Sequence, residues 1–228
     1  MKYRLLDLFC GAGGATKGYQ QAGFYVVGVD NRPQPHYCGD EFYQADALSF
    51  PLDGYDAYHA SPPCQKWMDT NKNGEKLTRH IDLITPIRPM LSATARPFII
   101  ENVHKAPLRA GLLLCGTMFG LHVIRHRYFE FNFPPPFSPF HCNHWGQVAS
   151  GDFIGVYARG GRGHRQGEGK RDGPPESPKV TTEEAMGIDW MSKYELTQAI
   201  PPAYTEYIGR YLMQVLAEGD ERENIEEG

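Results

Sequence analysis

A cysteine that follows two prolines is the residue of this chain best suited to covalent chemistry. Cys64 lies in segment 61–65 (SPPCQ), directly after a short apolar run over 56–61. Proline fixes the φ angle, so the Pro-Pro pair stiffens the backbone that holds the thiol. A thiolate held in this way can add to an electron-poor carbon. A lone cysteine in such a segment is more often structural than catalytic, so its meaning depends on the polar residues that accompany it.

Four further polar residues could assist such a cysteine. Glu101 and Asn102 end another apolar run, and Arg125 and Arg127 follow a predicted turn or strand over 119–123. Burial raises the pKa of a carboxyl group and lets it donate a proton, and arginines stabilise developing negative charge. Each pair alone has a plain structural alternative: a helix cap for Glu-Asn and solvated surface for Arg-x-Arg.

Together these groups suit chemistry at C5 of cytosine. Addition of the Cys64 thiolate to C6 turns C5 into a nucleophilic carbon. Glu101 would protonate N3, and Arg127 would stabilise charge at O2, with Arg125 in support. A base inside a duplex cannot be reached, so the cytosine must flip out, under a predicted lid over 66–80.

A glycine-rich turn precedes this set in the chain. Segment 7–14 (DLFCGAGG) follows the first apolar run, and its glycines allow close approach of a ligand and a sharp entry into a helix. Asp30, at the end of the next run, suits ribose hydroxyls, and Asp46 suits an adenine amino group. The third glycine of the dinucleotide pattern G-x-G-x-x-G falls at Thr16. The sequence therefore favours an adenosyl cofactor over NAD.

The elements that must position these residues alternate in type. Short apolar runs over 3–9, 24–30, 56–61 and 98–103 suit buried parallel strands, and 14–22 is a helix-length connection. Parallel strands place their carboxyl ends at one edge of a sheet, where α/β proteins bind ligands. We therefore predict an α/β fold of the Rossmann-like kind.

The second half of the chain has a different texture. Residues 131–178 are rich in proline and glycine, and only 152–158 resembles a strand. Thr181 and Glu184 have the spacing of a capping box. A final helix is predicted over 203–217, with an apolar face that returns to the sheet. That face consists of Tyr204, Ile208, Tyr211, Leu212, Val215 and Leu216.

Four of these segments, in this order, resemble the motifs of the DNA cytosine-5 methyltransferase family. They are 9–13 (FCGAG), 62–65 (PPCQ), 101–103 (ENV) and 125–127 (RHR), and 181–187 is similar to the stretch before the family's last helix. The resemblance implies a Rossmann-like S-adenosylmethionine-dependent methyltransferase fold with a small irregular target-recognition lobe. It also implies S-adenosylmethionine as cofactor, S-adenosylhomocysteine as product and double-stranded DNA as substrate. The chain looks like a compact, phage-like member.

The resemblance implies a role for each matching residue. Phe9 would stack on the adenine, Asp30 would hold the ribose, and Asp46 would meet the adenine amino group. The cofactor-binding set is Phe9, Cys10, Gly11, Ala12, Gly13, Gly14, Asp30, Asn31, Asp46, Ala47 and Pro62. The catalytic set is Cys64, Glu101, Asn102, Arg125 and Arg127, and the nucleic-acid-binding set is Gln65, Lys66, Arg159, Arg162 and Arg165. The last three belong to the Arg/Gly segment 159–171, whose cations suit phosphate contacts, although a solvated loop is the alternative.

The same resemblance divides the chain into parts. Residues 1–130 and 179–217 form the expected catalytic domain, 131–178 a reduced target-recognition region, and 218–228 an acidic tail. Because the recognition region is short, specificity is expected to be short or relaxed, or to come from a homodimer or a separate partner. The chain departs from the family at Val123, where a Gln is usual. It also departs at 198–202 (QAIPP), which replaces a Gly-Asn-Ser signature.

Composition places the chain in a broad class. Its 228 residues with 41% hydrophobic content can form a core, and its apolar runs are shorter than the roughly 20 residues of a membrane span. Five cysteines in irregular positions favour reduced thiols. We expect a soluble, cytoplasmic protein with no membrane partner. The net charge of −4 does not by itself indicate a nucleic-acid binder.

A histidine- and cysteine-containing run over 141–144 (HCNH) raises the question of a metal. Its spacing, even with Cys115 or His164 added, matches no standard ligand pattern. We therefore expect no metal site, and a loop near the nucleic acid or a small-lobe core instead. Cys10 and Cys115 are expected to be small core residues.

Several functions compete with DNA methylation. RNA is an alternative substrate, because one branch of the family methylates tRNA, and a modified donor could transfer a bulkier group. A catalytically silent DNA-binding module is a different class, although it would have no chemical need for Cys64, Glu101 and Arg127. A dinucleotide-dependent oxidoreductase is a more distant alternative.

Overall fold

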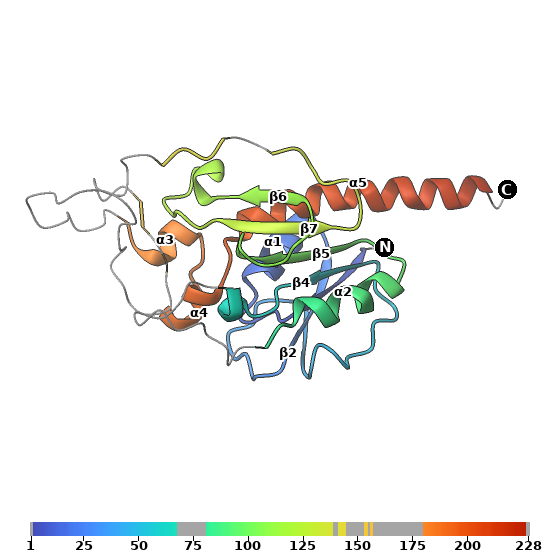
Figure 1. Ribbon diagram of the computed structural model, residues 1–228, viewed down its shortest axis with the longest axis horizontal. Coiled ribbons are helices and arrows are strands. Elements are labelled where there is room, and N and C mark those ends of the chain that lie inside the picture. Colours follow the sequence, from blue (N-terminus) through green and yellow to red (C-terminus); the bar gives the residue numbers. More distant parts are fainter. Residues whose placement is uncertain are drawn as a thin grey trace, which may run out of the picture.

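A seven-stranded sheet with helices on both faces forms the body of the protein (Figure 1). The computed structural model describes residues 2–67, 81–138, 141–144, 153–154, 156 and 180–226, with side chains up to 222. The strands are β1 (Arg4–Leu8), β2 (Tyr25–Asp30), β3 (Glu41–Gln44), β4 (Ala57–Ala60), β5 (Phe98–Asn102), β6 (Gly111–Leu114) and β7 (Arg127–Phe131). The helices are α1 (Gly14–Ala22), α2 (Ile84–Ala93), α3 (Thr182–Met186), α4 (Lys193–Gln198) and α5 (Pro202–Glu226), with 3₁₀ turns η1 (Cys64–Trp67) and η2 (Gly116–Phe119).

The strand order is β3-β2-β1-β4-β5-β7-β6, and the first five strands in this order are parallel. β7 lies antiparallel between β5 and β6. Consequently β1, β2, β4 and β5 all end at one edge of the sheet, as the sequence predicted for ligand-binding residues.

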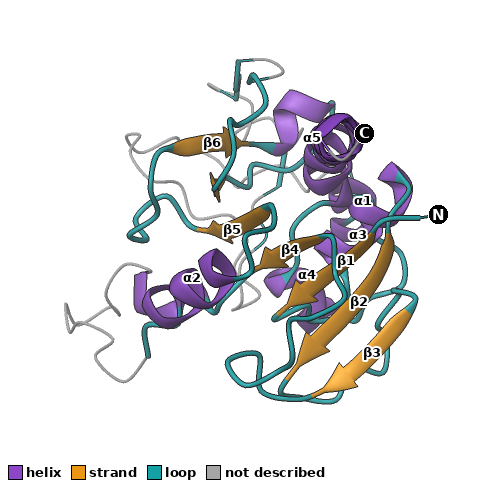
Figure 2. Cartoon of the chain, turned by 90° about the vertical axis from the view of Figure 1, so that its right-hand side faces the viewer, coloured by secondary structure: helices purple, strands orange, loops and turns teal. Residues whose placement is uncertain are grey.

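Alternation of side chains along the strands builds a core on each face. Leu5 and Val26 pack with α1 and α5, and Leu6 and Val27 pack with α2. Figure 2 shows α1 and α5 on one face of the sheet and α2 on the other. The α/β fold and the βαβ unit are therefore confirmed, with α1 at the residues predicted for it.

The predicted capping box at the start of α3 is also confirmed. The Thr181 hydroxyl accepts a hydrogen bond from the backbone N–H of Glu184, and the Glu184 carboxylate accepts one from the backbone N–H of Thr181. The two groups satisfy backbone donors that a helix start otherwise leaves without partners.

The final helix is longer than the sequence predicted. α5 continues through most of the acidic segment to Glu226, and Figure 1 shows it extending beyond the body of the molecule. The Tyr3 hydroxyl donates to Asp220 at 2.6 Å, which ties this extension to the start of the chain. Good helix formers such as glutamate sustain the helix where the apolar face has ended. No helix in the described parts of the chain is both long and apolar enough to cross a lipid bilayer.

The stretch 119–123, predicted as a turn or strand, is a turn. It begins at the last residue of the 3₁₀ turn η2 and belongs to none of the described strands. Among the described residues, Val123 forms a single parallel bridge to Ile154. The next strand is β7, in which Glu130 pairs with Arg88 at 2.7 Å. A charged residue inside the strand hides it from a hydrophobicity pattern. Most of the strand predicted over 152–158 lies outside the described residues.

Close packing of α1 against α5 generates a stability prediction. A Cβ atom at Gly18 would overlap the Pro202 carbonyl and the Thr205 hydroxyl, and that hydroxyl already bonds the Ala15 carbonyl at 2.8 Å. We expect Gly18→Ala to lower the free energy of unfolding by about 2 kcal/mol or more, measured in urea. Gly219→Ala on the open part of α5 is the control, with an expected gain of about 0.5–1 kcal/mol. Equal effects at the two positions would contradict the packing argument.

Candidate active site

The glycine-rich turn connects β1 to α1 and is hydrogen-bonded to the end of β2. Phe9, Gly11 and Gly13 all have positive φ angles, of 62°, 52° and 88°. The N–H of Gly11 donates to the Asp30 carboxylate at 3.1 Å, and the N–H of Cys10 donates to the Val29 carbonyl at 3.1 Å. A positive φ is the conformation that glycine adopts without strain. The turn is therefore shaped by its glycines and anchored to Asp30.

Space around the turn differs from one glycine to the next. A Cβ at Gly13 would lie 2.8 Å from the Cys38 sulfur, and one at Gly14 would lie 2.6 Å from the Ile200 carbonyl oxygen. At Gly11 no described heavy atom other than its own and its neighbours' lies within 4 Å of that position. The open side of the turn is thus at Gly11, beside Asp30, where a ligand could approach the backbone.

The acidic residues expected at the cofactor differ in their surroundings. Asp30 also accepts the N–H of Arg32 at 2.9 Å, and its carboxylate keeps acceptor capacity for ribose hydroxyls. Asp46 is exposed and accepts the N–H of Leu48 at 3.0 Å. Asn31 is exposed as well, whereas Ala47 is buried. These positions fit an adenosyl group lying along the ends of β2 and β3.

Asp7 is a buried acid that the sequence analysis did not single out. It is fully buried in β1, where one carboxylate oxygen accepts the Thr16 hydroxyl at 2.6 Å. The other oxygen has no hydrogen-bond partner among the described residues. Burial raises its pKa to about 7, although the bond from Thr16 opposes this shift. An acidic residue inside an apolar strand was the signal that could have revealed it.

Cys64 opens the 3₁₀ turn η1, just beyond β4, and is half-buried. Burial raises the pKa of its thiol, and the nearby guanidinium groups of Arg127 and Arg125 oppose that increase. The preceding Pro62 is held by Asn102, whose side-chain amide donates to the Pro62 carbonyl at 2.8 Å. The structure therefore brings the predicted cysteine to the same edge as the end of β5.

Glu101 lies beside Arg127 at this edge. The Arg127 Nε and a Glu101 carboxylate oxygen are 2.9 Å apart, but the N–H is not aligned for a hydrogen bond, and this oxygen has no other partner in the described chain. Burial raises the pKa of Glu101, and the charges of Arg127 and Arg125 oppose this shift. Cys64, Glu101 and Arg127 thus form one partly desolvated group, as the sequence predicted.

A buried hydrogen-bonded chain reaches Glu101 from the core. The Tyr19 hydroxyl lies 2.9 Å from Nδ1 of His59, and Nε2 of His59 lies 2.7 Å from the Ser61 hydroxyl. Ser61 in turn bonds Glu101 and lowers its pKa. Burial lowers the pKa of His59 to about 3, so its ring is neutral and carries one donor and one acceptor. The sequence analysis missed this chain because Tyr19 and His59 come from different elements.

Arg125 makes contacts other than those expected of a group that supports Arg127 at the substrate. Its guanidinium donates to the Val156 carbonyl at 2.8 Å and to the Thr197 carbonyl at 2.9 Å. Burial, followed by the repulsion of Arg127, lowers its pKa to about 9. Arg125 therefore connects the segment before β7 to Val156 and to α4, and it acts on the site through its charge.

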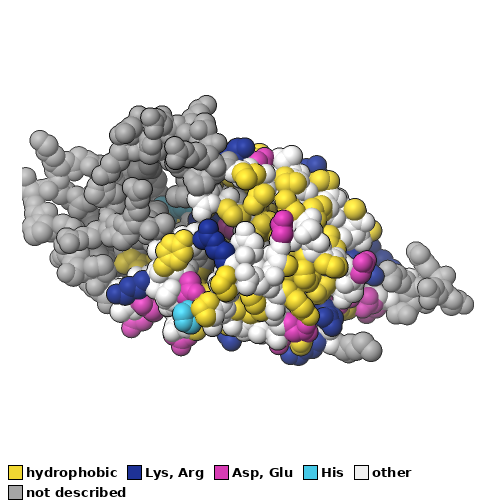
Figure 3. Space-filling view, turned by 90° about the horizontal axis from the view of Figure 1, so that it is seen from below, with side chains coloured by type: hydrophobic (Ala, Val, Ile, Leu, Met, Phe, Trp, Pro, Cys, Tyr) yellow, Lys and Arg dark blue, Asp and Glu magenta, His cyan; other side chains and the backbone are white. Residues whose placement is uncertain are grey.

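The predicted nucleic-acid contacts are described only in part. Gln65 is half-buried and Lys66 is exposed, with its ammonium 5.4 Å from the centre of the Trp67 ring. Arg159, Arg162 and Arg165, and residues 68–80 of the predicted lid, lie outside the described residues. On the face drawn in Figure 3, the described basic and acidic side chains are interspersed.

Solved structures resemble this fold over most of the chain. A protein described as a DNA modification methyltransferase from an E. coli prophage has a TM-score of 0.59 at 15% identity, covering 95% of this chain and 100% of the other. The Dnmt2 methyltransferase of S. pombe has a TM-score of 0.62 at 14% identity, over 95% and 99%. The Entamoeba histolytica methyltransferase EhMeth has a TM-score of 0.59 at 12% identity, over 95% and 99%. The chain has the fold of these methyltransferases.

The sequence itself gives no such match. Comparison with protein-family models and with curated proteins found no match. At 12–15% identity the three structures establish the Rossmann-like methyltransferase fold, and the chemistry must be argued from the site.

Asn102 generates a prediction about the position of Cys64. Asn102→Ala leaves the Pro62 carbonyl and the Val103 N–H without their present partners, so we expect a loss of about 2 kcal/mol in the free energy of unfolding. The released loop should also change the rate at which iodoacetamide alkylates Cys64, measured by peptide mass spectrometry. Asn132→Ala is the control, because Asn132 makes two similar backbone bonds at the opposite end of β5. An unchanged alkylation rate in Asn102→Ala would refute this positioning role.

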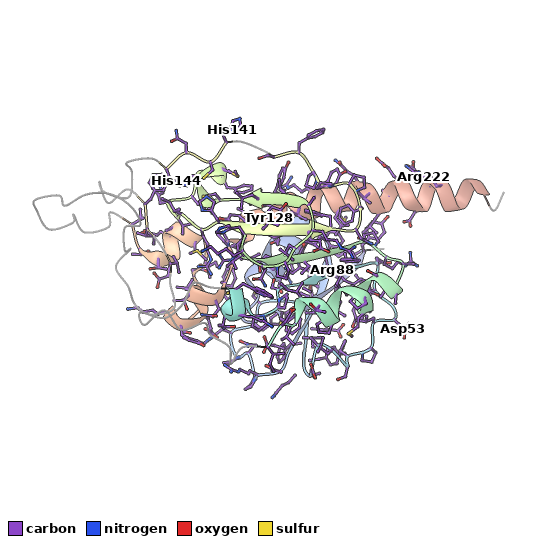
Figure 4. The ribbon with its side chains drawn as sticks, in the orientation of Figure 1. Asp53, Arg88, Tyr128, His141, His144 and Arg222 are labelled. Carbon is purple, nitrogen blue, oxygen red and sulfur yellow. The ribbon has the colours of Figure 1, made fainter. Side chains whose placement is uncertain are left out.

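Asp7 generates a prediction about pH. Because its folded pKa is about 7, the folded chain keeps a proton that the unfolded chain releases near pH 4. The contribution of protonated Asp7 to the free energy of unfolding is therefore complete below about pH 4 and is lost as the pH rises through 7. Asp7→Asn removes this titration, so urea unfolding between pH 4.5 and 8 should show less loss of stability, by up to about 4 kcal/mol. Asp53→Asn, at an exposed carboxylate labelled in Figure 4, should leave the pH profile unchanged. Parallel profiles for Asp7→Asn and wild type would refute the assignment.

Proposed function

We propose that this protein is an S-adenosylmethionine-dependent methyltransferase that methylates C5 of cytosine in DNA through a covalent bond to Cys64. The observation that carries the proposal is the grouping of Cys64 with the Glu101–Arg127 pair, at the sheet edge that also holds the glycine turn. This edge combines a nucleophile, a proton donor and a cation in a partly desolvated place.

The order of events follows from the chemistry of the base. The Cys64 sulfur forms a bond to C6, and the displaced π electrons move onto the ring. Glu101 donates a proton at N3, and Arg127 stabilises the charge at O2. C5 would then take the methyl group, which leaves S-adenosylhomocysteine as product. A base would remove the C5 proton, the C6–S bond would break to return the thiolate, and the N3 proton would return to Glu101.

The two pKa shifts support different parts of this sequence. A raised pKa keeps a larger fraction of Glu101 protonated near neutral pH, as a donor requires. A raised pKa leaves less of Cys64 as thiolate, and the opposing charges of Arg127 and Arg125 favour the reactive form.

The cofactor would lie on the open side of the glycine turn. S-adenosylmethionine supplies a methyl group on a sulfonium centre when it is bound. Gly11 offers an approachable backbone, and Asp30 offers acceptors for ribose hydroxyls. Phe9 is held in the left-handed region next to them, and Trp190 covers the turn by donating to the Ala12 carbonyl at 3.0 Å.

Double-stranded DNA is the proposed substrate. The resemblance of the four motifs to DNA cytosine-5 methyltransferases supports it, as does a prophage protein of similar fold described as a DNA modification enzyme. A half-buried Cys64 requires the target base to leave the helix. A homodimer or a separate partner would supply specificity if the short recognition region does not.

Methyl transfer from labelled S-adenosylmethionine tests the proposal directly. Duplex DNA, RNA and a reaction without nucleic acid are compared for wild type and Cys64→Ala. We expect label on DNA cytosine, and a loss of roughly 10³-fold or more in the variant because its covalent route is removed. Trapping on DNA that contains 5-fluorocytosine should occur in the wild type only.

Two controls make the result interpretable. Stabilisation of Cys64→Ala by S-adenosylhomocysteine, seen as a rise in melting temperature, shows that the variant is folded and binds the cofactor. Label on RNA but not DNA would replace the proposed substrate. Undiminished transfer by Cys64→Ala would refute the proposed nucleophile.

A further inference from the structure

Four potential metal ligands converge at the end of the sheet that carries β6 and β7. Cys115, His126, Cys142 and His144 each offer one sulfur or nitrogen atom, and these atoms all lie within 4.8 Å of one another. We propose that they bind one Zn²⁺ ion as a structural site. This proposal does not depend on the proposed function.

Two of the six distances between the ligand atoms are close to the edges of a tetrahedron around zinc, and all six are within 4.8 Å. With Zn–S near 2.3 Å and Zn–N near 2.0–2.1 Å, ligand atoms should lie about 3.3–3.8 Å apart. The Nε2 atoms of His126 and His144 are 3.4 Å apart, and Nε2 of His126 is 3.2 Å from the Cys142 sulfur. Small movements of the four ligand side chains would therefore place their atoms in tetrahedral positions around one ion.

The donor types favour zinc over other common ions. Two thiolates and two imidazoles form a standard structural set, whereas Ca²⁺ and Mg²⁺ prefer oxygen ligands. Two thiolates also neutralise the charge of the ion. Four protein ligands leave no open position, so the site is structural and not catalytic.

Thr117 supplies a second set of contacts. Its hydroxyl donates to the Cys115 sulfur at 3.5 Å and lies 3.8 Å from the Cys142 sulfur. Hydrogen bonds to coordinating sulfurs orient the ligands of metal sites. One threonine therefore contacts both of the proposed thiolate ligands.

The ligands come from three separate segments. Cys115 follows β6, His126 immediately precedes β7, and Cys142 and His144 lie beyond the proline-rich stretch. This separation is why the spacing within 141–144 matched no standard pattern, and the proposal departs from the absence of metal expected from the sequence. The exposed His141 and the partly buried His144 are both labelled in Figure 4.

The proposed ion would fix the backbone between the two arginines of the site. His126 stands between Arg125 and Arg127, and its carbonyl accepts a hydrogen bond from Arg127 at 2.8 Å. A metal bound through His126 would also join the 141–144 segment to the sheet. The site would then connect the start of the recognition region with the candidate active site.

Metal content of the full chain tests the proposal. Protein purified with a reductant and without chelator is assayed by mass spectrometry for metals, and apo protein is titrated with Co²⁺. We expect about one zinc per chain and a cobalt spectrum with thiolate charge-transfer and tetrahedral bands. Cys142→Ser and His144→Ala should lose both signals. The control variants His141→Ala and Cys38→Ser should keep them.

A thiol-protection measurement avoids dependence on variants that fail to fold. Zinc should slow alkylation of Cys115 and Cys142 in the wild type by at least roughly tenfold, whereas Cys38 should react at an unchanged rate. Wild-type protein that stays metal-free after incubation with zinc, or a disulfide between Cys115 and Cys142 under reducing conditions, would overturn the proposal. Methyl transfer is not a readout here, so failure of the metal site and failure of the proposed enzyme are distinguishable.

Discussion

Parallel pairing of β2, β1, β4 and β5 forces the carboxyl ends of these strands onto one edge of the sheet. Each strand ends in, or is followed by, a part of the candidate site: the glycine turn, Asp30, Cys64 and Glu101. These groups are far apart in the chain, and only the sheet brings them together. The hydrogen bond from Asn102 to the Pro62 carbonyl then fixes the segment before Cys64 against the end of β5.

Burial of charge at this edge creates opposing electrostatic effects. Desolvation disfavours the ionised forms of both Cys64 and Glu101, and the charges of the buried Arg125 and the partly buried Arg127 disfavour the neutral forms. Arg125 is itself desolvated and repelled by Arg127, and two backbone carbonyls hold it in place. The fold therefore supplies the stability that keeps a reactive set of charges together.

The last quarter of the chain contacts the glycine turn and α1, although it is far from them in the sequence. Trp190 bonds the Ala12 carbonyl, and Ile200 lies against Gly14. Thr205 bonds the Ala15 carbonyl, so α5 holds α1 from the C-terminal side. The glycine turn is consequently supported by residues near the C-terminal end of the chain, and a disturbance of either part should reach the other.

Local sequence signals determined much of this structure. The apolar runs predicted β1, β2, β4 and β5, the glycine turn predicted α1, and Thr181 with Glu184 predicted the start of α3. Each of these signals lies within a few residues, where propensity and hydrogen bonding act directly. The motifs also marked Cys64, Glu101 and Arg127, which the fold brings to one edge.

Tertiary structure decided what depends on contacts between distant residues. Asp7 and the Tyr19–His59–Ser61 chain acquire their properties from burial, and Arg125 acquires its carbonyl partners from Val156 and from α4. The cluster of Cys115, His126, Cys142 and His144 has no sequence pattern because its members come from three segments. The spacing of residues in a sequence predicts only the geometry of nearby residues. Desolvation and convergence depend on which elements the sheet and α5 place side by side.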